Sequence, residues 1–412
     1  MGIVERYHRT PLYLKILVGM VLGLGVGLVV NETWAARLNV PAKIILQLLG
    51  AIAPPLILVA VVRALMTANV KGRMAGRLFY LLALNTLVAI FIGLTVANVL
   101  RPGKHGTLNP GTVAETSGDP LTQFLENIPH SLVGPLVDNN VIGVIIIAVA
   151  IGLAARRLPK ERADAMLGAV DTAFDLIITV LHWIIALVPL AVFGKVVYVV
   201  GTDGFRPFVA LGWFIVAVLV GLALQGTYYL LRVKFGSWVR PTDLIRGTRD
   251  ALVMAFSTGS STATMPVTFE CLIKRVGLRE ESASLGALVG SNFNNDGTAL
   301  YEAMSALFIA QMLGMDLSLT KQLMVVLTSV VASVGAAGIP EAGLVTMTLV
   351  FRAVGLPIGY IALLLPVDWF LDRCRTAVNV MGDMNVSCML EGRDRHPSAL
   401  PEALQTADAT RA

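Results

Sequence analysis

A charged stretch near the C-terminal end of the sequence, DWFLDRCRTAVNVMGD (368–383), has the residue types needed to bind a charged small molecule. Five of its polar residues are spaced at i, i+3, i+4, i+7 and i+11: Asp372, Arg375, Thr376, Asn379 and Asp383. This spacing puts them on one face of an α-helix. An arginine offers a planar fork of donors to a carboxylate, and an aspartate offers a counter-charge to an ammonium. The face predicts a site for a zwitterion with an additional carboxylate. The simpler alternative is an internal Asp–Arg pair that only stabilises the helix.

The rest of the chain has the composition of a membrane protein. Of its 412 residues, 56% are hydrophobic and only 14% are charged, whereas soluble domains carry about a quarter charged residues. A membrane-spanning helix needs roughly 20 apolar residues, and suitable windows occur at 12–30, 79–100, 141–155, 176–200 and 208–231. We therefore expect an all-α polytopic membrane protein, in which ionisable side chains at membrane depth are functional by default.

The distribution of charge predicts the orientation. Basic residues gather before the first window and in the segments 63–77, 156–162 and 232–249. By the positive-inside rule these segments are cytoplasmic, so we expect both termini inside the cell, in the plasma (inner) membrane, and no nucleic-acid partner. The tail 393–412 is expected to be a disordered cytoplasmic segment. The three cysteines show no metal-ligand spacing and are expected to be unpaired thiols: Cys271, Cys374 and Cys388.

From about residue 243 onward, polar clusters of small residues interrupt the hydrophobic pattern. They are STGSSTATMP (257–266), GSNFNNDGT (290–298) and ASVGAAGIPEAG (332–343). Small residues in membrane helices often only permit close packing. Several clusters together with buried charges favour broken helices around a transporter's binding site instead, because non-helical backbone survives at membrane depth only inside protein or beside a water-filled cavity. We expect two re-entrant hairpins, centred near Ser261 and Gly338.

Five motifs occur in an order that resembles a known family: SSTATMPVTFECL, NNDGTALYEA, FIAQ, ASVGAAGIPEAGLVTM and DWFLDRCRTAVNVMGD. They resemble the glutamate transporters of the dicarboxylate/amino acid:cation symporter family, densely over residues 243–384. The resemblance implies eight transmembrane helices plus two re-entrant helical hairpins, an elevator-type fold and a homotrimer. It implies scaffold spans 1–2 in 1–77, span 3 of the transport domain in 78–101, an extracellular loop and scaffold spans 4–5 in 102–204, and the remaining transport domain in 205–392.

The resemblance also implies the site residues. For an acidic amino acid, Asp372 matches the position that holds the α-ammonium and Arg375 the one that holds the side-chain carboxylate. The other implied substrate residues are Ser261, Thr298, Ala337, Gly338, Gly343, Thr376 and Asn379. Three sodium sites are implied at Gly290, Asn294, Asn379 and Asp383; at Asn85, Thr86, Asn294 and Asp296; and at Ser333, Val334 and Ala336. Oxygen ligands of this kind suit Na⁺.

The sequence departs from the family pattern at positions that concern ion coupling. Asn295 stands where the family usually has methionine, which puts ion–substrate coupling in doubt. Asn85 replaces a threonine of the deep sodium site, and Glu341 lies at the second hairpin tip. Glu302 and Arg373 match residues linked to proton carriage in some members. A buried Glu302 can take up protons, and the alternative is a permanently ionised Glu302 paired with Arg373.

The resulting expectation is a secondary active symporter of aspartate or glutamate, with Na⁺ favoured as the driving ion and H⁺ co-transport as an addition. It is not expected to be an enzyme or to carry an organic cofactor. Its partners are the acidic amino acid, membrane lipids and its own copies. The alternatives are a purely proton-driven symporter, a C4-dicarboxylate symporter, disfavoured by Asp372, and an intramembrane hydrolase using Ser260 or Ser261, disfavoured because no histidine is placed to act as base.

Overall fold

The computed structural model describes residues 10–67, 73–108, 128–138, 140–335 and 342–395. Every regular element within these ranges is a helix, as expected for an all-α membrane protein. The predictions for Ala336, Ala337, Gly338, Glu341 and most of the tail (396–412) lie outside the described residues. All three cysteines are described and are unpaired thiols, as predicted.

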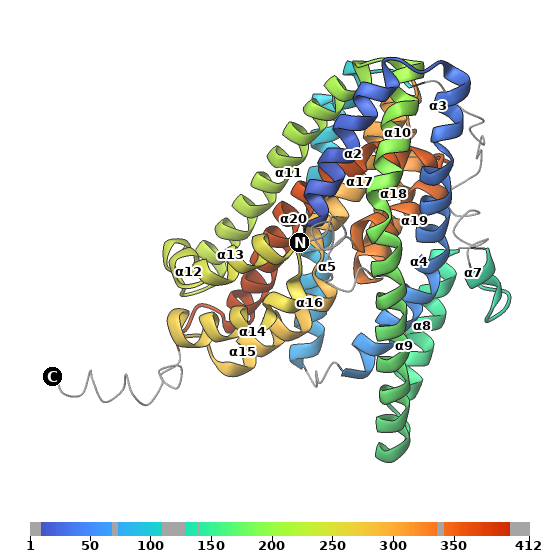
Figure 1. The fold of residues 1–412 in the computed structure, drawn as a ribbon. Helices are drawn as coiled ribbons and strands as arrows, with labels where there is room; N and C mark the ends of the chain where they lie inside the picture. Colours follow the sequence, from blue (N-terminus) through green and yellow to red (C-terminus); the bar gives the residue numbers. More distant parts are fainter. Residues whose placement is uncertain (1–9, 68–72, 109–127, 139, 336–341, 396–412) are drawn as a thin grey trace, which may run out of the picture.

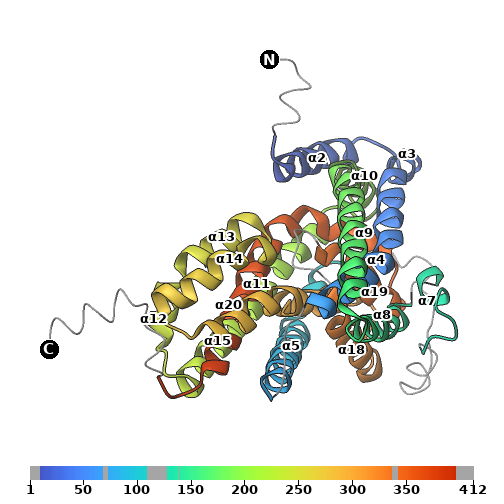
Figure 2. The ribbon, with the colours of Figure 1, turned by 90° about the horizontal axis from the view of Figure 1, so that it is seen from below.

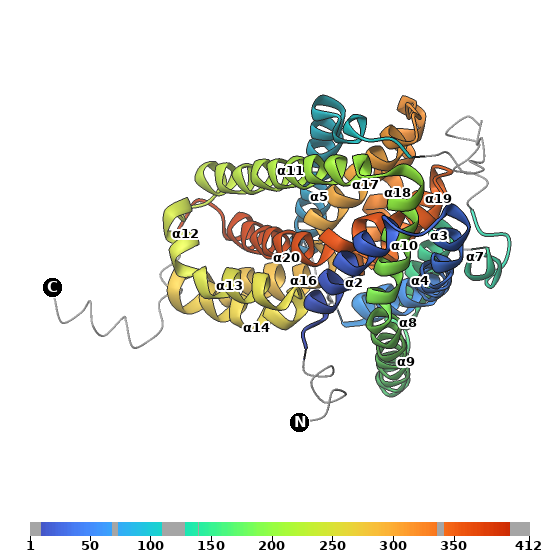
Figure 3. The ribbon, with the colours of Figure 1, turned by 45° about the horizontal axis from the view of Figure 1, so that its top comes forward.

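The helices of residues 12–67 and 134–203 form one packed group. Most of it lies on the right of Figure 1, and it is seen again in Figures 2 and 3. Within it α10 packs along α2 and α4, and α4 packs against α8 and α9. The group consists of α2 (Leu12–Gly27), α3 (Glu32–Leu38), α4 (Val40–Thr67), α7 (Gly134–Val137), α8 (Val141–Ala155), α9 (Lys160–Ala186) and α10 (Val188–Asp203).

A second group contains α5 and the helices that follow α10. The long helix α20 packs against α11, α13 and α17, and α5 packs against α11 and α17. The group consists of α5 (Arg73–Leu100), η1 (Pro102–His105), α11 (Arg206–Gly236), α12 (Pro241–Gly247), α13 (Arg249–Thr258), α14 (Ser261–Cys271), η2 (Leu272–Val276), α15 (Glu280–Ser284), η3 (Leu285–Val289), α16 (Gly290–Phe293), α17 (Asp296–Met312), α18 (Leu319–Gly335), α19 (Ala342–Ala353), η4 (Ile358–Tyr360) and α20 (Ile361–Glu391).

Four helices of the described residues are long and apolar enough to cross a membrane: Glu32–Thr67, Gly76–His105, Lys160–Ala186 and Arg206–Gly236. Shorter apolar helices accompany them, and α20 is 31 residues long but carries the charged stretch. The count of eight spans and the elevator motion stay predictions.

The window 176–200, expected to hold one span, is divided between two helices. α9 ends at Ala186, and α10 begins at Val188 with Pro189 in its first turn. Proline has no N–H to continue the hydrogen-bond ladder of the preceding helix, but it fits the first turn of a new one. The apolar run is therefore continuous in sequence and interrupted in structure.

Two helix pairs and one broken helix surround α20. Gly259, with a left-handed φ of 64°, ends α13, and Ser260 then caps α14 by accepting a hydrogen bond from the Ala263 N–H at 3.1 Å. The pair α18 and α19 flanks residues 336–341. Between α16 and α17 the chain leaves helical geometry at Asn294 and Asn295. The first two polar clusters thus mark interruptions between helices, and the third begins in the last turn of α18 and reaches the start of α19.

Candidate functional site

The predicted polar face of α20 is entirely buried. Its five members are between 0% and 6% exposed: Asp372, Arg375, Thr376, Asn379 and Asp383. α20 supplies them because it runs through the middle of the second group, between α11, α13 and α17. Charged groups buried in this way need partners, so their contacts define the site.

Arg375 is shared between two carboxylates. Its Nη1 donates to Asp368 Oδ1 at 2.8 Å and its Nη2 to Asp372 Oδ1 at 2.7 Å, while the guanidinium carbon lies 3.9 Å from the centre of the Tyr301 ring. The internal Asp–Arg pair considered above is therefore present. Asp368 is an additional partner to which sequence reasoning gave no role. With two carboxylates and one guanidinium, the cluster keeps one net negative charge when all three groups are ionised.

Both helix pairs reach this cluster. A Cβ on Gly259 would lie 3.1 Å from Asp372 Oδ2, which places the tip of the first pair next to that carboxylate. Ser261, two residues further on at the start of α14, is buried. At the start of α19, a Cβ on Gly343 would lie 3.2 Å from Arg375 Nη2 and 3.2 Å from the Thr298 methyl group. The described predicted substrate residues therefore converge on one place from α14, α17, α19 and α20.

Asn379 joins α20 to the broken helix. Its Oδ1 accepts the Gly297 N–H at 2.7 Å, and its Nδ2 lies 3.4 Å from both Asn295 Oδ1 and Thr298 Oγ1. Thr376, one turn earlier, donates its hydroxyl to the Asp372 carbonyl at 2.8 Å. The polar face is thus held in a fixed relation to the first turn of α17.

Two buried oxygens beside this junction fit a cation. Asn294 Oδ1 and Asp383 Oδ1 accept no hydrogen bond from the described residues, and the Asn294 Nδ2 donates to the Asn379 carbonyl at 3.1 Å. A Cβ on Gly290 would lie 2.6 Å from Asp383 Oδ1, so only glycine lets that backbone come so close. A carboxylate with amide and carbonyl oxygens is a ligand set for Na⁺. The described residues hold no cluster of three or more His, Cys, Asp or Glu side chains suited to a metal.

The side chains predicted for the deep sodium site have protein partners instead. Asp296 accepts hydrogen bonds on both carboxylate oxygens, from Thr86 Oγ1 at 2.7 Å and from the Tyr229 hydroxyl. Asn85 Oδ1 accepts a hydrogen bond from Arg232 Nη1. Sequence reasoning missed both α11 residues, Tyr229 and Arg232. Their only signal is an arginine near the end of an apolar window, which the positive-inside rule explains equally well as a cytoplasmic charge.

The residues predicted for the third sodium site lie at the end of α18. The Ser333 carbonyl accepts a hydrogen bond from Asn295 Nδ2 at 2.9 Å. Val334 follows in the same helix. Asn295, the departure from the family pattern, thus ties α18 to the broken helix.

The two proton-coupling candidates are not paired with each other. Glu302 is completely buried in α17, where its Oε1 accepts a hydrogen bond from Thr346 of α19 and its Oε2 accepts none from the described residues. Arg373 donates instead to the Trp369 carbonyl at 2.7 Å and lies over the Trp369 ring.

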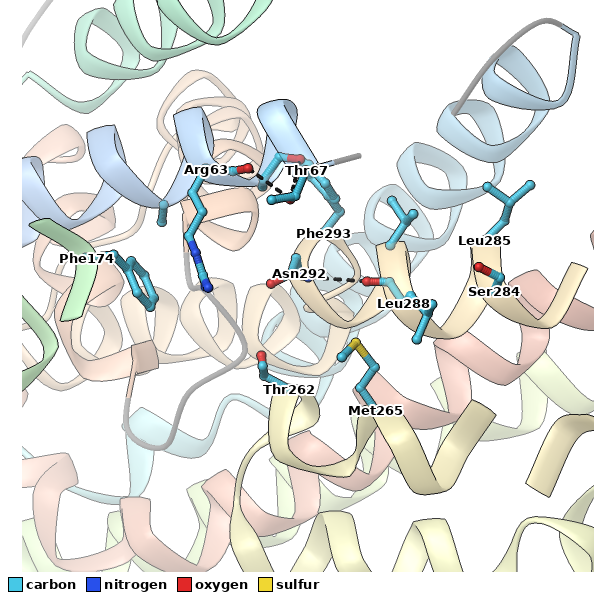
Figure 4. A pocket seen from close by; sticks show the side chains of 13 residues that line it. Arg63, Thr67, Phe174, Thr262, Met265, Ser284, Leu285, Leu288, Asn292 and Phe293 are labelled. Carbon is cyan, nitrogen blue, oxygen red and sulfur yellow. Dashed lines mark hydrogen bonds between the residues drawn. The ribbon is translucent and has the colours of Figure 1, made fainter. Parts of the chain in front are cut away.

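A cavity of about 370 Å³ lies between α4 and α9 on one side and the segment from α14 to α16 on the other. Arg63 and Thr67 of α4 line one side and Asn292 and Thr262 the other, as Figure 4 shows. Arg63 is bound within its own group, donating to Asp171 Oδ1 at 2.6 Å. The boundary between the two helix groups is open at this cavity, while elsewhere α18 and α19 pack against α4, and α20 packs against α10.

Buried charges in a largely apolar helical chain, gathered where helices are interrupted, are the arrangement expected of a membrane transporter. The chain belongs to the sodium:dicarboxylate symporter family, which it matches over residues 12–392. It is 30% identical to excitatory amino acid transporter 3 of Mus musculus, over 90% of this chain and 83% of that protein. It is 31% identical to an excitatory amino acid transporter of Caenorhabditis elegans, over 84% and 79%. The resemblance noted from the motifs is thereby confirmed.

Proposed function

We propose that this protein is a secondary active symporter of acidic amino acids, aspartate or glutamate, driven by a cation gradient in which Na⁺ is the favoured ion. The observation that carries the proposal is the buried cluster of Asp372 and Arg375, with Thr298, Gly259 and Gly343 around it. It offers groups of opposite charge within one dry site, as a zwitterion with a second carboxylate requires. Relatives named excitatory amino acid transporters support this substrate class.

Coupling to Na⁺ is supported by the free oxygens of Asn294 and Asp383. These oxygens, with the Gly290 and Asn379 carbonyls, would hold the ion next to the residues that hold the substrate. A cation there lowers the electrostatic cost of binding an anion nearby, so the two ligands favour each other's binding.

Proton co-transport is a second route, supported by Glu302. Its carboxylate has no cationic partner among the described residues, and its Oε2 accepts no hydrogen bond. A proton is one way to neutralise such a group. Purely proton-driven transport is the corresponding alternative.

For the transport step we propose that the second helix group moves against the first within each subunit of a homotrimer, in an elevator-type alternating-access mechanism. Residues 1–77 and 102–204 would form the stationary scaffold in the plasma membrane, with both termini cytoplasmic. Residues 78–101 and 205–392 would carry the substrate. The cavity between the groups supports a boundary that slides.

A C4-dicarboxylate is the alternative substrate that the family's description allows. It has no ammonium, so Asp372 would repel one of its carboxylates. Asp372→Asn should therefore weaken aspartate uptake while sparing or improving succinate uptake. An equal loss of both would mean that Asp372 only supports Arg375.

The experiment that tests the proposal is uptake of labelled aspartate, glutamate and succinate into proteoliposomes, with Na⁺ and H⁺ gradients imposed separately. Acidic amino-acid uptake that requires an inward Na⁺ gradient is the expected result. Uptake driven by a proton gradient alone, and lost in Glu302→Gln, would establish the proton-driven alternative. Accumulation of succinate without either amino acid would contradict the proposed substrate.

A further inference from the structure

A cation from α11 reaches the deepest of the predicted sodium ligands. Arg232 donates through Nη1 to Asn85 Oδ1, and Asn85 is completely buried in α5. The guanidinium carbon also lies 5.4 Å from the centre of the Tyr228 ring. An amide oxygen and an aromatic ring thus hold the guanidinium in one position, turned toward the interior of the second helix group.

The neighbouring carboxylate has no oxygen left without a donor. Asp296 is completely buried, with Thr86 on one oxygen and Tyr229 on the other, and Asn85, which holds Arg232, directly precedes Thr86 in α5. At the other predicted sodium position, by contrast, the Oδ1 atoms of Asn294 and Asp383 accept no hydrogen bond from the described residues. The Asn294–Asp383 position therefore has oxygens free to bind a cation, whereas both oxygens of Asp296 already accept hydrogen bonds.

A second cation at the deep position would meet a like charge. A sodium ion ligated by Asn85 and Asp296 would have to compete with the guanidinium for the amide oxygen and then lie beside it. In a buried region such repulsion is strong, because the effective dielectric constant is well below that of water.

We propose that Arg232 is a tethered cation that takes the place of sodium at the deep position, so that this chain binds no Na⁺ there. The guanidinium holds the Asn85 amide oxygen that a sodium ion at this position would need. The proposal rests on the proposed function in one respect: it assumes that Na⁺ ions are transported together with the substrate.

A competing explanation is that Arg232 merely marks the membrane boundary, as basic residues at helix ends do. Lys234, two residues further along α11, fits that description because it is exposed and contacts only the Phe235 ring among the interactions of the described residues. Arg232 differs in that it is half-buried and engages Asn85. The two residues therefore form a matched pair for an experiment.

Sodium binding to the full-length protein in lipid nanodiscs tests the proposal without substrate. The melting temperature is measured in NaCl and in choline chloride of equal concentration. Arg232→Gln should show a larger Na⁺-specific rise than the wild type, because a bound ion stabilises the folded state. Arg232→Lys and Lys234→Gln should respond like the wild type. An equal rise in Arg232→Gln and wild type would overturn the proposal. If Arg232→Gln does not fold, Arg232→Met makes the same comparison.

A second measurement counts the ions. In Arg232→Gln, about a tenfold rise in Na⁺ concentration should shift the Kd for aspartate by about ten times more than in the wild type, as linkage requires for one further coupled ion. If the Kd for aspartate depends on Na⁺ concentration equally steeply in Arg232→Gln and in the wild type, the proposal is contradicted. Failure of the wild type to bind aspartate would instead count against the proposed function, and the substrate-free melting comparison would still decide the role of Arg232.

Discussion

At the scale of single residues, the buried charges of α20 determine what the site can hold. Asp368 and Asp372 both engage the Arg375 guanidinium through its Nη atoms, and the buried Arg375 Nε–H donates to no group of the described residues. In the proposed function, a substrate carboxylate binds this guanidinium while Asp372 faces the substrate's ammonium and Asp368 keeps the arginine in place. We therefore expect the site to favour ligands that carry both charges.

The first prediction is that Arg375→Cys abolishes uptake of aspartate and glutamate. Losing a charged contact in a dry site costs about 2–5 kcal/mol, and Asp368 and Asp372 are left without their shared cation. Binding of labelled aspartate to purified protein measures the loss, with a melting curve to show that the variant is folded. Arg373→Gln is the control for loss of a neighbouring positive charge, because among the described residues Arg373 donates to the Trp369 carbonyl and not to Asp368 or Asp372. Unchanged aspartate affinity in folded Arg375→Cys would refute the assignment.

The second prediction concerns Asn295, whose side chain ties the Ser333 carbonyl to the start of α17. Asn295→Met removes this tie and frees a carbonyl predicted to bind sodium. We expect aspartate affinity to depend more steeply on Na⁺ concentration in this variant than in the wild type. Titration of aspartate at low and high Na⁺ measures the effect. If the aspartate affinity of Asn295→Met depends on Na⁺ concentration no more steeply than that of the wild type, the Asn295 amide does not occupy the place of a sodium ion at the Ser333 carbonyl.

The polar face of α20 could be predicted from the sequence because helical spacing alone puts its residues together. The same is true of the helix interruptions, which the small-residue clusters mark. The contacts made by α11 could not be predicted in this way. Tyr229, which donates to Asp296, and Arg232, which donates to Asn85, lie 67 and 64 residues before Asp296, and only the packing of α11 against α5 and α17 brings them there. The break at Leu187 could not be predicted from hydrophobicity, because a single proline hardly changes the mean over a window.

At the scale of elements, the tip of the first helix pair works through its backbone. Gly259 ends α13 in the left-handed region and has no side chain between the tip and Asp372. A second glycine, Gly277, has a similar backbone conformation after η2. A Cβ on Gly277 would meet only the Trp238 ring, at 3.9 Å, and no charged group. Comparing substitutions at the two glycines therefore separates the stability lost through backbone strain from an effect on the Asp372 site.

The third prediction uses this pair of glycines. Gly259→Ala and Gly277→Ala should each lose about 1–2 kcal/mol of stability from left-handed strain. Only Gly259→Ala should also weaken aspartate binding, because its methyl group would press on Asp372. Chemical denaturation and a binding titration of both variants make the comparison. Equal aspartate affinity in the two variants would mean that the tip does not approach the substrate.

At the scale of the whole molecule, the boundary between the two helix groups is partly open. Ala64 of α4 lines the cavity there, opposite Met265 and Asn292. Sliding of one group along the other requires that such space is not filled by a rigid side chain. In the proposed mechanism the second group alone binds the substrate, so filling this cavity tests movement of the groups separately from substrate binding.

The fourth prediction is that Ala64→Trp lowers aspartate uptake severalfold while leaving aspartate binding within about twofold of the wild type. The indole would wedge between α4 and the α14–α16 segment. Uptake into proteoliposomes and binding to purified protein are measured on the same preparation. Ala223→Trp on the exposed face of α11 is the matched control. Normal uptake by Ala64→Trp would rule out movement across this cavity.

The position of the Arg232 guanidinium at Asn85 also affects how uptake depends on membrane voltage. A charge attached to α11 travels back with the empty carrier, so it adds nothing to the current, whereas a sodium ion in its place would carry one positive charge inward in every cycle. Moving one charge across the membrane is worth about 2.3 kcal/mol per 100 mV, or roughly a 40- to 50-fold difference in the concentration ratio that uptake can sustain. If Arg232 takes the place of that sodium ion, we expect a lower ceiling of accumulation and an uptake that depends less steeply on membrane voltage.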